Sequence, residues 1–104
     1  MRFAIAKLAL AASLALPVTA AEMTGWIVDA WCGASNANGS DASRACTKDC
    51  IKKGSDTAFV DDKSQKVYKI ANKDKVAAHM DHKVKIAGAV SGENLTVEQV
   101  AAVK

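Results

Sequence analysis

The sequence predicts a mainly β fold, a small five-stranded barrel, and three observations lead to this prediction. From residue 83 to residue 90, apolar and polar positions alternate with the period of a half-buried strand. Other short runs rich in β-branched and aromatic residues are separated by turns, such as the turn at residues 91–94. Two short helical patterns lie between these runs, and the order of strands and helices matches that of a small barrel.

The first strand is expected at residues 23–31, an apolar run that ends in a turn at Cys32-Gly33. The polar residues 34–40 have the composition of a loop. A helix then starts at Ser40 or Asp41, since both side chains cap free backbone N–H groups. This helix stops before Gly54 and carries two lysines in its last turn. Its buried face is expected to hold Ala42, Ala45, Cys46 and Cys50.

The next elements are predicted as a hairpin, with strands at residues 57–61 and 66–71 joined by a polar turn. In the second of these strands, Tyr68 and Ile70 are expected to face inward. A second helix then runs from a cap at Asn72 to about Met80. Its apolar stripe is formed by Val76, Ala77 and Met80.

The last two strands are predicted around residues 84–90 and from Leu95 to about Val103. The full order is strand, cysteine-bearing helix, strand, strand, short helix, strand and strand. If the cysteine-bearing helix is an insertion after strand 1, this is the order of the five-stranded OB barrel, with a short helix between strands 3 and 4. The alternative is an open antiparallel sheet with one or two helices on one face.

The N-terminal residues predict a signal peptide. Arg2 and Lys7 precede an uncharged apolar stretch at residues 8–16, and small residues follow up to Ala20. A membrane anchor would need about 20 apolar residues, which is roughly twice this length. We therefore expect residues 1–20 to be cleaved, leaving a single OB-like domain at residues 21–104 that is periplasmic or secreted and has no membrane attachment.

The charge of the mature chain gives no reason to expect a nucleic-acid partner. The net charge of the whole chain is +3, and cleavage before Ala21 removes two basic and no acidic residues, which leaves +1. Binding to phosphates needs a clustered basic surface. A mild basic face is conceivable on neighbouring strands, but aromatic platforms for stacking bases are nearly absent. The lysines of that face are Lys66, Lys69, Lys83 and Lys85.

Four segments carry the most specific patterns, namely TGWIVDAWCG at 24–33, CTKDCIKKG at 46–54, VYKI at 67–70 and VKIAGAV at 84–90. In these segments the chain resembles a family of small exported bacterial proteins of uncharacterised function. The resemblance implies an OB-like barrel and a periplasmic or secreted location, and it implies no activity or substrate. Members of that family often carry a histidine shortly after the Cys-Gly turn, where this chain has Ser35 and Asn36. That departure weakens any metal site that would use such a histidine.

The three cysteines predict one disulfide in an oxidising compartment, with one sulfur left over. A regular helix aims the Cβ atoms of Cys46 and Cys50 roughly parallel, which suits a bond between them poorly. Cys32 is therefore the expected partner of one of them. The bond would close a loop of about 15 to 20 residues and stabilise the fold by about 3 kcal/mol. The remaining thiol allows a disulfide dimer, although a monomer is expected.

The same cysteines have two other interpretations. Three thiolates from Cys32, Cys46 and Cys50 would suit copper(I) or zinc, with a fourth zinc ligand from His79, His82 or water. The histidines are, however, expected on a solvated turn around a core Met80. A redox role is a weaker hypothesis, because the Cys-x-x-Cys spacing of oxidoreductases is missing.

The leading prediction is a non-enzymatic, disulfide-stabilised binding module for a small ligand or a partner protein. A serine nucleophile would need a Gly-x-Ser-x-Gly elbow or a positioned histidine and aspartate, and the serines of this chain lie in no such context. The alternative is a thiolate protein that binds copper or zinc through Cys32, Cys46 and Cys50. The number of free thiols distinguishes the two.

Overall fold

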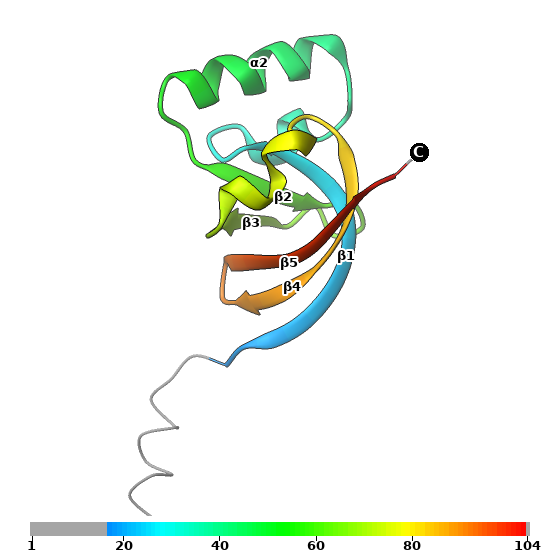
Figure 1. The fold of residues 1–104 in the computed structure, drawn as a ribbon. Helices are drawn as coiled ribbons and strands as arrows, with labels where there is room; N and C mark the ends of the chain where they lie inside the picture. Colours follow the sequence, from blue (N-terminus) through cyan, green and yellow to red (C-terminus); the bar gives the residue numbers. More distant parts are fainter. Residues whose placement is uncertain (1–16, 104) are drawn as a thin grey trace, which may run out of the picture.

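The computed structural model describes residues 17–103. The predicted signal peptide falls largely on residues 1–16, which lie outside the described residues. The described chain forms a closed barrel of five strands in the order β1-β2-β3-β5-β4 (Figure 1). The predicted mainly β, OB-like barrel is thereby confirmed. The strands are β1 (Thr19–Asp29), β2 (Thr57–Asp61), β3 (Val67–Ile70), β4 (Lys83–Ser91) and β5 (Asn94–Ala102).

β1 is the longest strand and pairs with two partners. Its first part is antiparallel to β4, from Thr19 opposite Val90 to Trp26 opposite Lys83. Its second part is antiparallel to β2, from Gly25 to Asp29. Gly25 lies where the partners change, and a Cβ atom there would overlap the carbonyl oxygen of Val60. The missing side chain therefore lets the curved strand turn from one partner to the other.

The barrel closes between β3 and β5, which are parallel and pair through only two positions, Lys69 with Asn94 and Ile70 with Leu95. The side chain of Asn72 extends this short seam. Its Nδ2 donates to the carbonyl oxygen of Val97 at 2.7 Å, and its Oδ1 accepts from the Val97 N–H at 2.9 Å. Asn72 precedes the helix as predicted but makes no side-chain capping hydrogen bond. It holds the barrel closed instead.

The interior of the barrel is filled by alternating residues of all five strands. Val84 and Ile86 point inward between exposed or half-buried neighbours, as the period of this segment predicts. Tyr68 and Ile70 also face inward, which confirms the prediction for β3. The buried core consists of Ile27, Phe59, Tyr68, Ile70, Val76, Val84, Ile86, Leu95 and Val97.

Three short elements lie outside the barrel wall. The helix α2 (Asp41–Lys52) is inserted between β1 and β2, and the 3-10 helix η1 (Gly33–Asn36) precedes it. A second 3-10 helix, η2 (Lys73–His79), connects β3 to β4. Figure 1 shows α2 and η2 near the same end of the barrel. None of the helices in the described part of the chain is long and apolar enough to cross a membrane.

The helix α2 begins as the sequence predicts, because Ser40 is its N-cap and accepts a hydrogen bond from the Ser43 N–H at 3.1 Å. The predicted face is wrong in part. Ala42 and Ala45 are exposed, whereas Ser43 and Thr47 are buried beside half-buried Cys46 and Cys50. The helix faces a buried carboxylate at the barrel end, so polar side chains lie underneath it.

η2 differs from the predicted helix in type and in its contacts. It is a 3-10 helix, and Val76 is its buried residue. Ala77 is exposed, and Met80 lies just after the element, packed against the core while half-buried. Side chains at i and i+3 eclipse in a 3-10 helix, so the predicted stripe reduces to Val76 alone.

Candidate metal centre

The three cysteines converge at the end of the barrel that carries α2. Cys32 lies in the turn after β1, and Cys46 and Cys50 lie one turn apart on α2. Their Sγ atoms all lie within 4.8 Å of one another. Cys32 is exposed, while Cys46 and Cys50 are half-buried. The structure thus brings together the three sulfur atoms that the sequence analysis singled out.

The predicted disulfide is not formed in this structure, in which all three cysteines are free. The Sγ atoms of Cys32 and Cys46 lie 3.8 Å apart, well beyond the bond length of about 2.05 Å. The prediction named Cys46 or Cys50 as the partner of Cys32. The contact with Cys46 singles out that pair as the one nearer to bonding.

The sulfur positions fit a soft metal ion. Ligand sulfurs about 2.3 Å from zinc lie about 3.8 Å apart in a tetrahedral site, and the Cys32–Cys46 separation is 3.8 Å. A closure of about 1 Å at most would bring sulfurs separated by up to 4.8 Å to the same spacing. The i, i+4 spacing on α2 presents two sulfurs on one side of a helix without distortion. Thiolates prefer copper(I) and zinc among common metals.

Asp29, which the sequence analysis missed, is the buried centre of the surrounding structure. It ends β1 and is 0% exposed. Its Oδ2 accepts from the Cys32 N–H at 2.8 Å, and its Oδ1 accepts from Asn36 Nδ2 at 2.7 Å and Thr47 Oγ1 at 3.1 Å. A single acid in the apolar run of the first strand was a sequence signal for this role, because a strand buries an acid only when it is hydrogen-bonded.

Ser55 makes a second link between the barrel and α2. Its Oγ accepts from the N–H groups of Ala30 and Trp31 at 3.0 and 3.2 Å. Its own N–H donates to the carbonyl oxygen of Cys50 at 2.9 Å. Beside this link the Trp31 side chain is 59% exposed, next to Cys32 in the chain. The turn that carries Cys32 is therefore held on both sides of the tryptophan.

The surroundings of Cys32 and Cys50 keep these two thiols protonated. Burial, followed by a hydrogen bond with Cys46, raises the pKa of the Cys50 thiol to about 12. The contact with Cys46, followed by burial and the charge of Asp29, raises the pKa of Cys32. For Asp29 itself, burial favours the neutral acid, but the hydrogen bonds from Cys32, Asn36 and Thr47 outweigh it and lower the pKa. A metal ion would therefore have to displace protons from neutral thiols beside a carboxylate.

The two histidines lie apart from this ligand group. His79 ends η2 and is half-buried, and His82 is exposed just before β4. Neither belongs to the set of ligand atoms within 4.8 Å of one another in the described residues. Asp81 lies between the two histidines in the chain and is 5% exposed. Its N–H donates to the carbonyl oxygen of Ile27 in β1. Burial raises its pKa, and its Oδ1 has no hydrogen-bond partner in the described residues.

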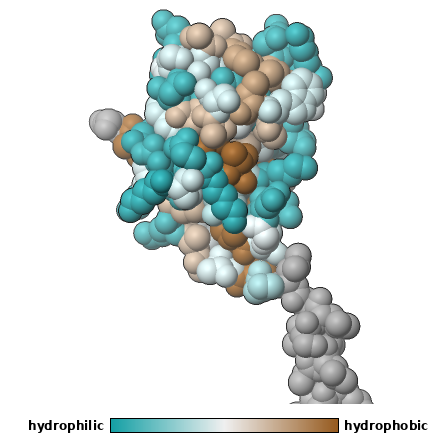
Figure 2. Space-filling view, turned by 180° about the vertical axis from the view of Figure 1, so that it is seen from behind, coloured by the Kyte–Doolittle hydropathy of each residue, from teal (hydrophilic) through white to brown (hydrophobic). Residues whose placement is uncertain are grey.

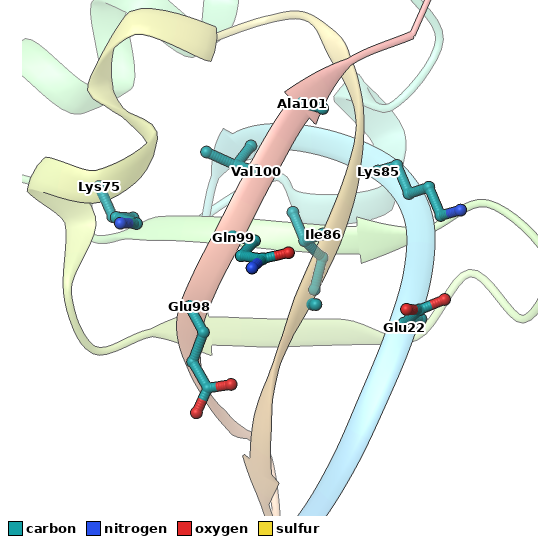
Figure 3. A pocket seen from close by; sticks show the side chains of 9 residues that line it. Glu22, Lys75, Lys85, Ile86, Glu98, Gln99, Val100 and Ala101 are labelled. Carbon is teal, nitrogen blue, oxygen red and sulfur yellow. The ribbon is translucent and has the colours of Figure 1, made fainter.

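Two shallow grooves lie away from the sulfurs. The larger has a volume of about 720 Å³ and is lined by strands β1, β4 and β5 together with Lys75 of η2 (Figure 3). Its charges are mixed, because Glu22 and Glu98 face Lys75 and Lys85 around it. The smaller, of about 590 Å³, is lined by apolar atoms of α2 and by Met80. Figure 2 shows hydrophilic residues over much of one face, with a smaller hydrophobic area between them.

The four lysines considered for a basic face are partly neutralised. Lys83 Nζ lies 2.9 Å from a carboxylate oxygen of Asp62, and Lys69 Nζ lies 3.8 Å from Asp56. Lys66 Nζ lies 5.1 Å from the centre of the Tyr68 ring. The Tyr68 ring is buried in the core and the Lys66 ammonium group lies over it, so it has no free face on which a base could stack.

Comparisons of the chain with models of protein families, with curated proteins and with solved structures found no match. The resemblance to small exported bacterial proteins therefore stays a prediction.

Proposed function

We propose that this protein binds a soft metal ion, copper(I) or zinc, through the thiolates of Cys32, Cys46 and Cys50. The observation that carries this proposal is the convergence of three sulfurs from two separate elements within 4.8 Å. Their spacing fits metal–sulfur bonds, as described above. No distortion of α2 is needed, because two of the ligands are one helical turn apart.

The surroundings support binding and delivery rather than catalysis. The exposed position of Cys32 leaves the sulfur cluster open to solvent on one side, where a water molecule or a partner's ligand can complete the coordination. The rigid barrel holds the end of β1 in place. We infer a non-enzymatic, monomeric protein that acts in the periplasm or outside the cell, where it buffers or passes on its ion.

The test is native and denaturing mass spectrometry of the protein purified from the periplasm without reductant, with thiol alkylation before any reduction. One bound copper or zinc ion per chain, together with three alkylated thiols once the ion is removed, supports the proposal. Loss of the ion in Cys32→Ser, Cys46→Ser and Cys50→Ser, with retention in the control Ser35→Ala, assigns it to the three sulfurs. A chain that takes up neither metal would disprove it.

A second candidate function is the binding module that the sequence predicted, stabilised by a disulfide between Cys32 and Cys46. The 3.8 Å contact between these two sulfurs favours it, because a small movement would bring them to bonding distance. The mixed-charge groove lined by Glu22, Lys85 and Glu98 would then take a small polar ligand or a partner protein. A mass lower by two hydrogens, with one alkylated thiol, distinguishes this function from metal binding.

A further inference from the structure

Asp29 lies between the two elements that carry the cysteines. Its Oδ2 accepts a hydrogen bond from the backbone N–H of Cys32 itself. Its Oδ1 accepts one from the hydroxyl of Thr47, the residue directly after Cys46 on α2. The third bond, from Asn36, fixes the orientation of the carboxylate. The oxygen atoms of one buried group thus face both the turn and the helix.

From this geometry we infer that Asp29 is the positioning residue of the thiol cluster, setting the distance between Cys32 and the Cys46–Cys50 pair. In its consequence for metal binding, this inference rests on the proposed function. The carboxylate is not a metal ligand here, because both of its oxygens already accept hydrogen bonds from the protein. It acts through the elements that it joins.

The two carboxylate oxygens of Asp29 accept hydrogen bonds from different elements, so replacing one of these oxygens breaks one of the two connections. Asp29→Asn keeps the shape of the side chain but replaces one acceptor oxygen by an NH₂ group. In this variant the amide oxygen keeps the hydrogen bonds from Asn36 and Thr47. The amide NH₂ group then faces the Cys32 N–H, so two donors point at each other and no hydrogen bond forms there. The turn with Cys32 is then released, while the i, i+4 spacing of Cys46 and Cys50 on α2 remains.

The first arm of the test needs no metal. Oxidised glutathione is added to the reduced chain, so that the Cys32 and Cys46 thiols lose two protons and two electrons and form a disulfide. The oxidant becomes two molecules of glutathione. The rate of this step measures how well the two sulfurs are placed. We expect Asp29→Asn to slow it by about tenfold or more.

Alkylation of Cys32 separates lost positioning from a change in the reactivity of the thiol itself. The Cys32 thiol is exposed and its alkylation needs no partner sulfur, so a displaced turn leaves the alkylation rate undiminished. Slower pairing together with undiminished alkylation is the signature of lost positioning, and a uniformly destabilised fold would not produce it.

Two further variants keep the inference testable if Asp29→Asn fails to fold. Thr47→Val removes the hydrogen bond that the helix donates to the Asp29 carboxylate, together with the hydroxyl that also faces Asp81. We expect it to slow pairing of Cys32 with Cys46 by a smaller factor. Ser43→Ala is the matched control, because Ser43 is buried on the same side of α2 and its hydroxyl makes no bond to Asp29. It should pair at the wild-type rate.

The second arm uses cadmium(II), whose near-ultraviolet absorption grows with each thiolate ligand. We expect the wild-type chain to bind it with three thiolates. Asp29→Asn should bind it with two, with an absorption lower by about one third and an affinity lower by about 10- to 100-fold. Wild-type pairing rates in both Asp29→Asn and Thr47→Val would overturn the inference. A wild-type chain that binds no metal, with slowed pairing in these variants, would reject the proposed function and retain the positioning role.

Discussion

The side chain of Asn72 pairs with the backbone of Val97 through two hydrogen bonds, of 2.7 and 2.9 Å, as a neighbouring strand residue would. It lies at the point where the parallel seam between β3 and β5 has ended after two residue pairs. β5 also shifts register against β4 beside Val97, between Ala87 and Gly88. One amide side chain therefore continues the closure of the barrel beyond the backbone hydrogen bonds from Lys69 to Glu93 and from Ala71 to Leu95.

Replacing Asn72 should weaken the whole barrel. Asn72→Ala leaves the N–H and the carbonyl oxygen of Val97 without their partners, and we expect a loss of about 1 to 3 kcal/mol in the free energy of unfolding. Urea denaturation measures this change. Asn94→Ala, an exposed asparagine that pairs only through its backbone, is the control and should lose less than about 0.5 kcal/mol. Equal losses in both variants would contradict the role given to Asn72.

Asp81 should destabilise the protein at neutral pH. Its pKa is raised by burial, so the folded state binds its proton more tightly than the unfolded state does. The stabilisation contributed by the Asp81 carboxyl is fully present below its pKa in the unfolded chain, near 3.8. It is lost as the pH rises through the higher pKa of this carboxyl in the folded protein. Asn also tolerates the positive φ of 68° found here. We expect Asp81→Asn to raise the stability at pH 7 by about 1 kcal/mol.

The pH dependence checks the cause of this gain. Thermal unfolding of both chains from pH 3 to pH 7 should show the advantage of Asp81→Asn growing with pH and vanishing at the acidic end. An advantage that is constant with pH would show that the charge of Asp81 is not responsible.

Metal binding should release protons. The Cys32 and Cys50 thiols both have raised pKa values, that of Cys50 being about 12, so they are neutral at pH 7 and must ionise to bind. We expect at least two protons per ion in a weakly buffered zinc titration, and an apparent affinity that increases with pH. Cys50→Ser, which loses the ion, should release no protons in the same titration. Binding without proton release would show that these thiols are not the ligands.

Gly25 should tolerate no side chain. A Cβ atom at this position would overlap the backbone of Val60 and crowd the ring of Phe59, so one of the paired strands would have to move. We expect Gly25→Ala to cost about 2 kcal/mol or more in stability. Thr24→Ala, at the neighbouring half-buried position, should cost less. A fully stable Gly25→Ala would mean that β1 can bend elsewhere.

The mature N-terminus is a prediction that export itself can test. Cleavage before Ala21 removes Thr19 and Ala20, which pair with Val90 and Ala89 in the structure. The mature β1 would then begin opposite Gly88 and leave the end of β4 unpaired on that side. If the chain is exported, the intact mass of the protein recovered from the periplasm locates the cleavage site. A chain that retains residues 19 and 20 would show that the full pairing is kept.

The elements with clear local signals could be predicted from the sequence. The alternation of residues 84–90 gave β4, and Ser40 gave the start of α2, because both depend on neighbours in the chain. The face of α2 could not be predicted in the same way. Ala42 and Ala45 seemed the apolar choice, but the helix packs over a buried carboxylate that comes from β1. That partner is set by the tertiary structure.

The sequence predicts the three cysteine ligands of the candidate site, but not Asp29, whose hydrogen bonds join the elements that carry them. Three cysteines were visible as a group, and their convergence follows from an insertion that returns to the end of β1. Asp29 lies in a segment that the sequence predicts as an apolar strand. Nothing local shows that its hydrogen-bond partners are a turn and a helix residue 18 positions away. The spacing of the sulfurs is likewise a property of the folded chain.

The two tryptophans place optical probes of unequal exposure on either side of Asp29. Trp31 is 59% exposed and adjacent to Cys32, whereas Trp26 is half-buried and packs against Gly39. Emission from Trp31 therefore responds to any event at the Cys32 sulfur, and Trp26 supplies a steadier background from the same molecule. Ion uptake and thiol oxidation can thus be followed in the unlabelled protein in real time, with Trp31→Phe separating the two signals.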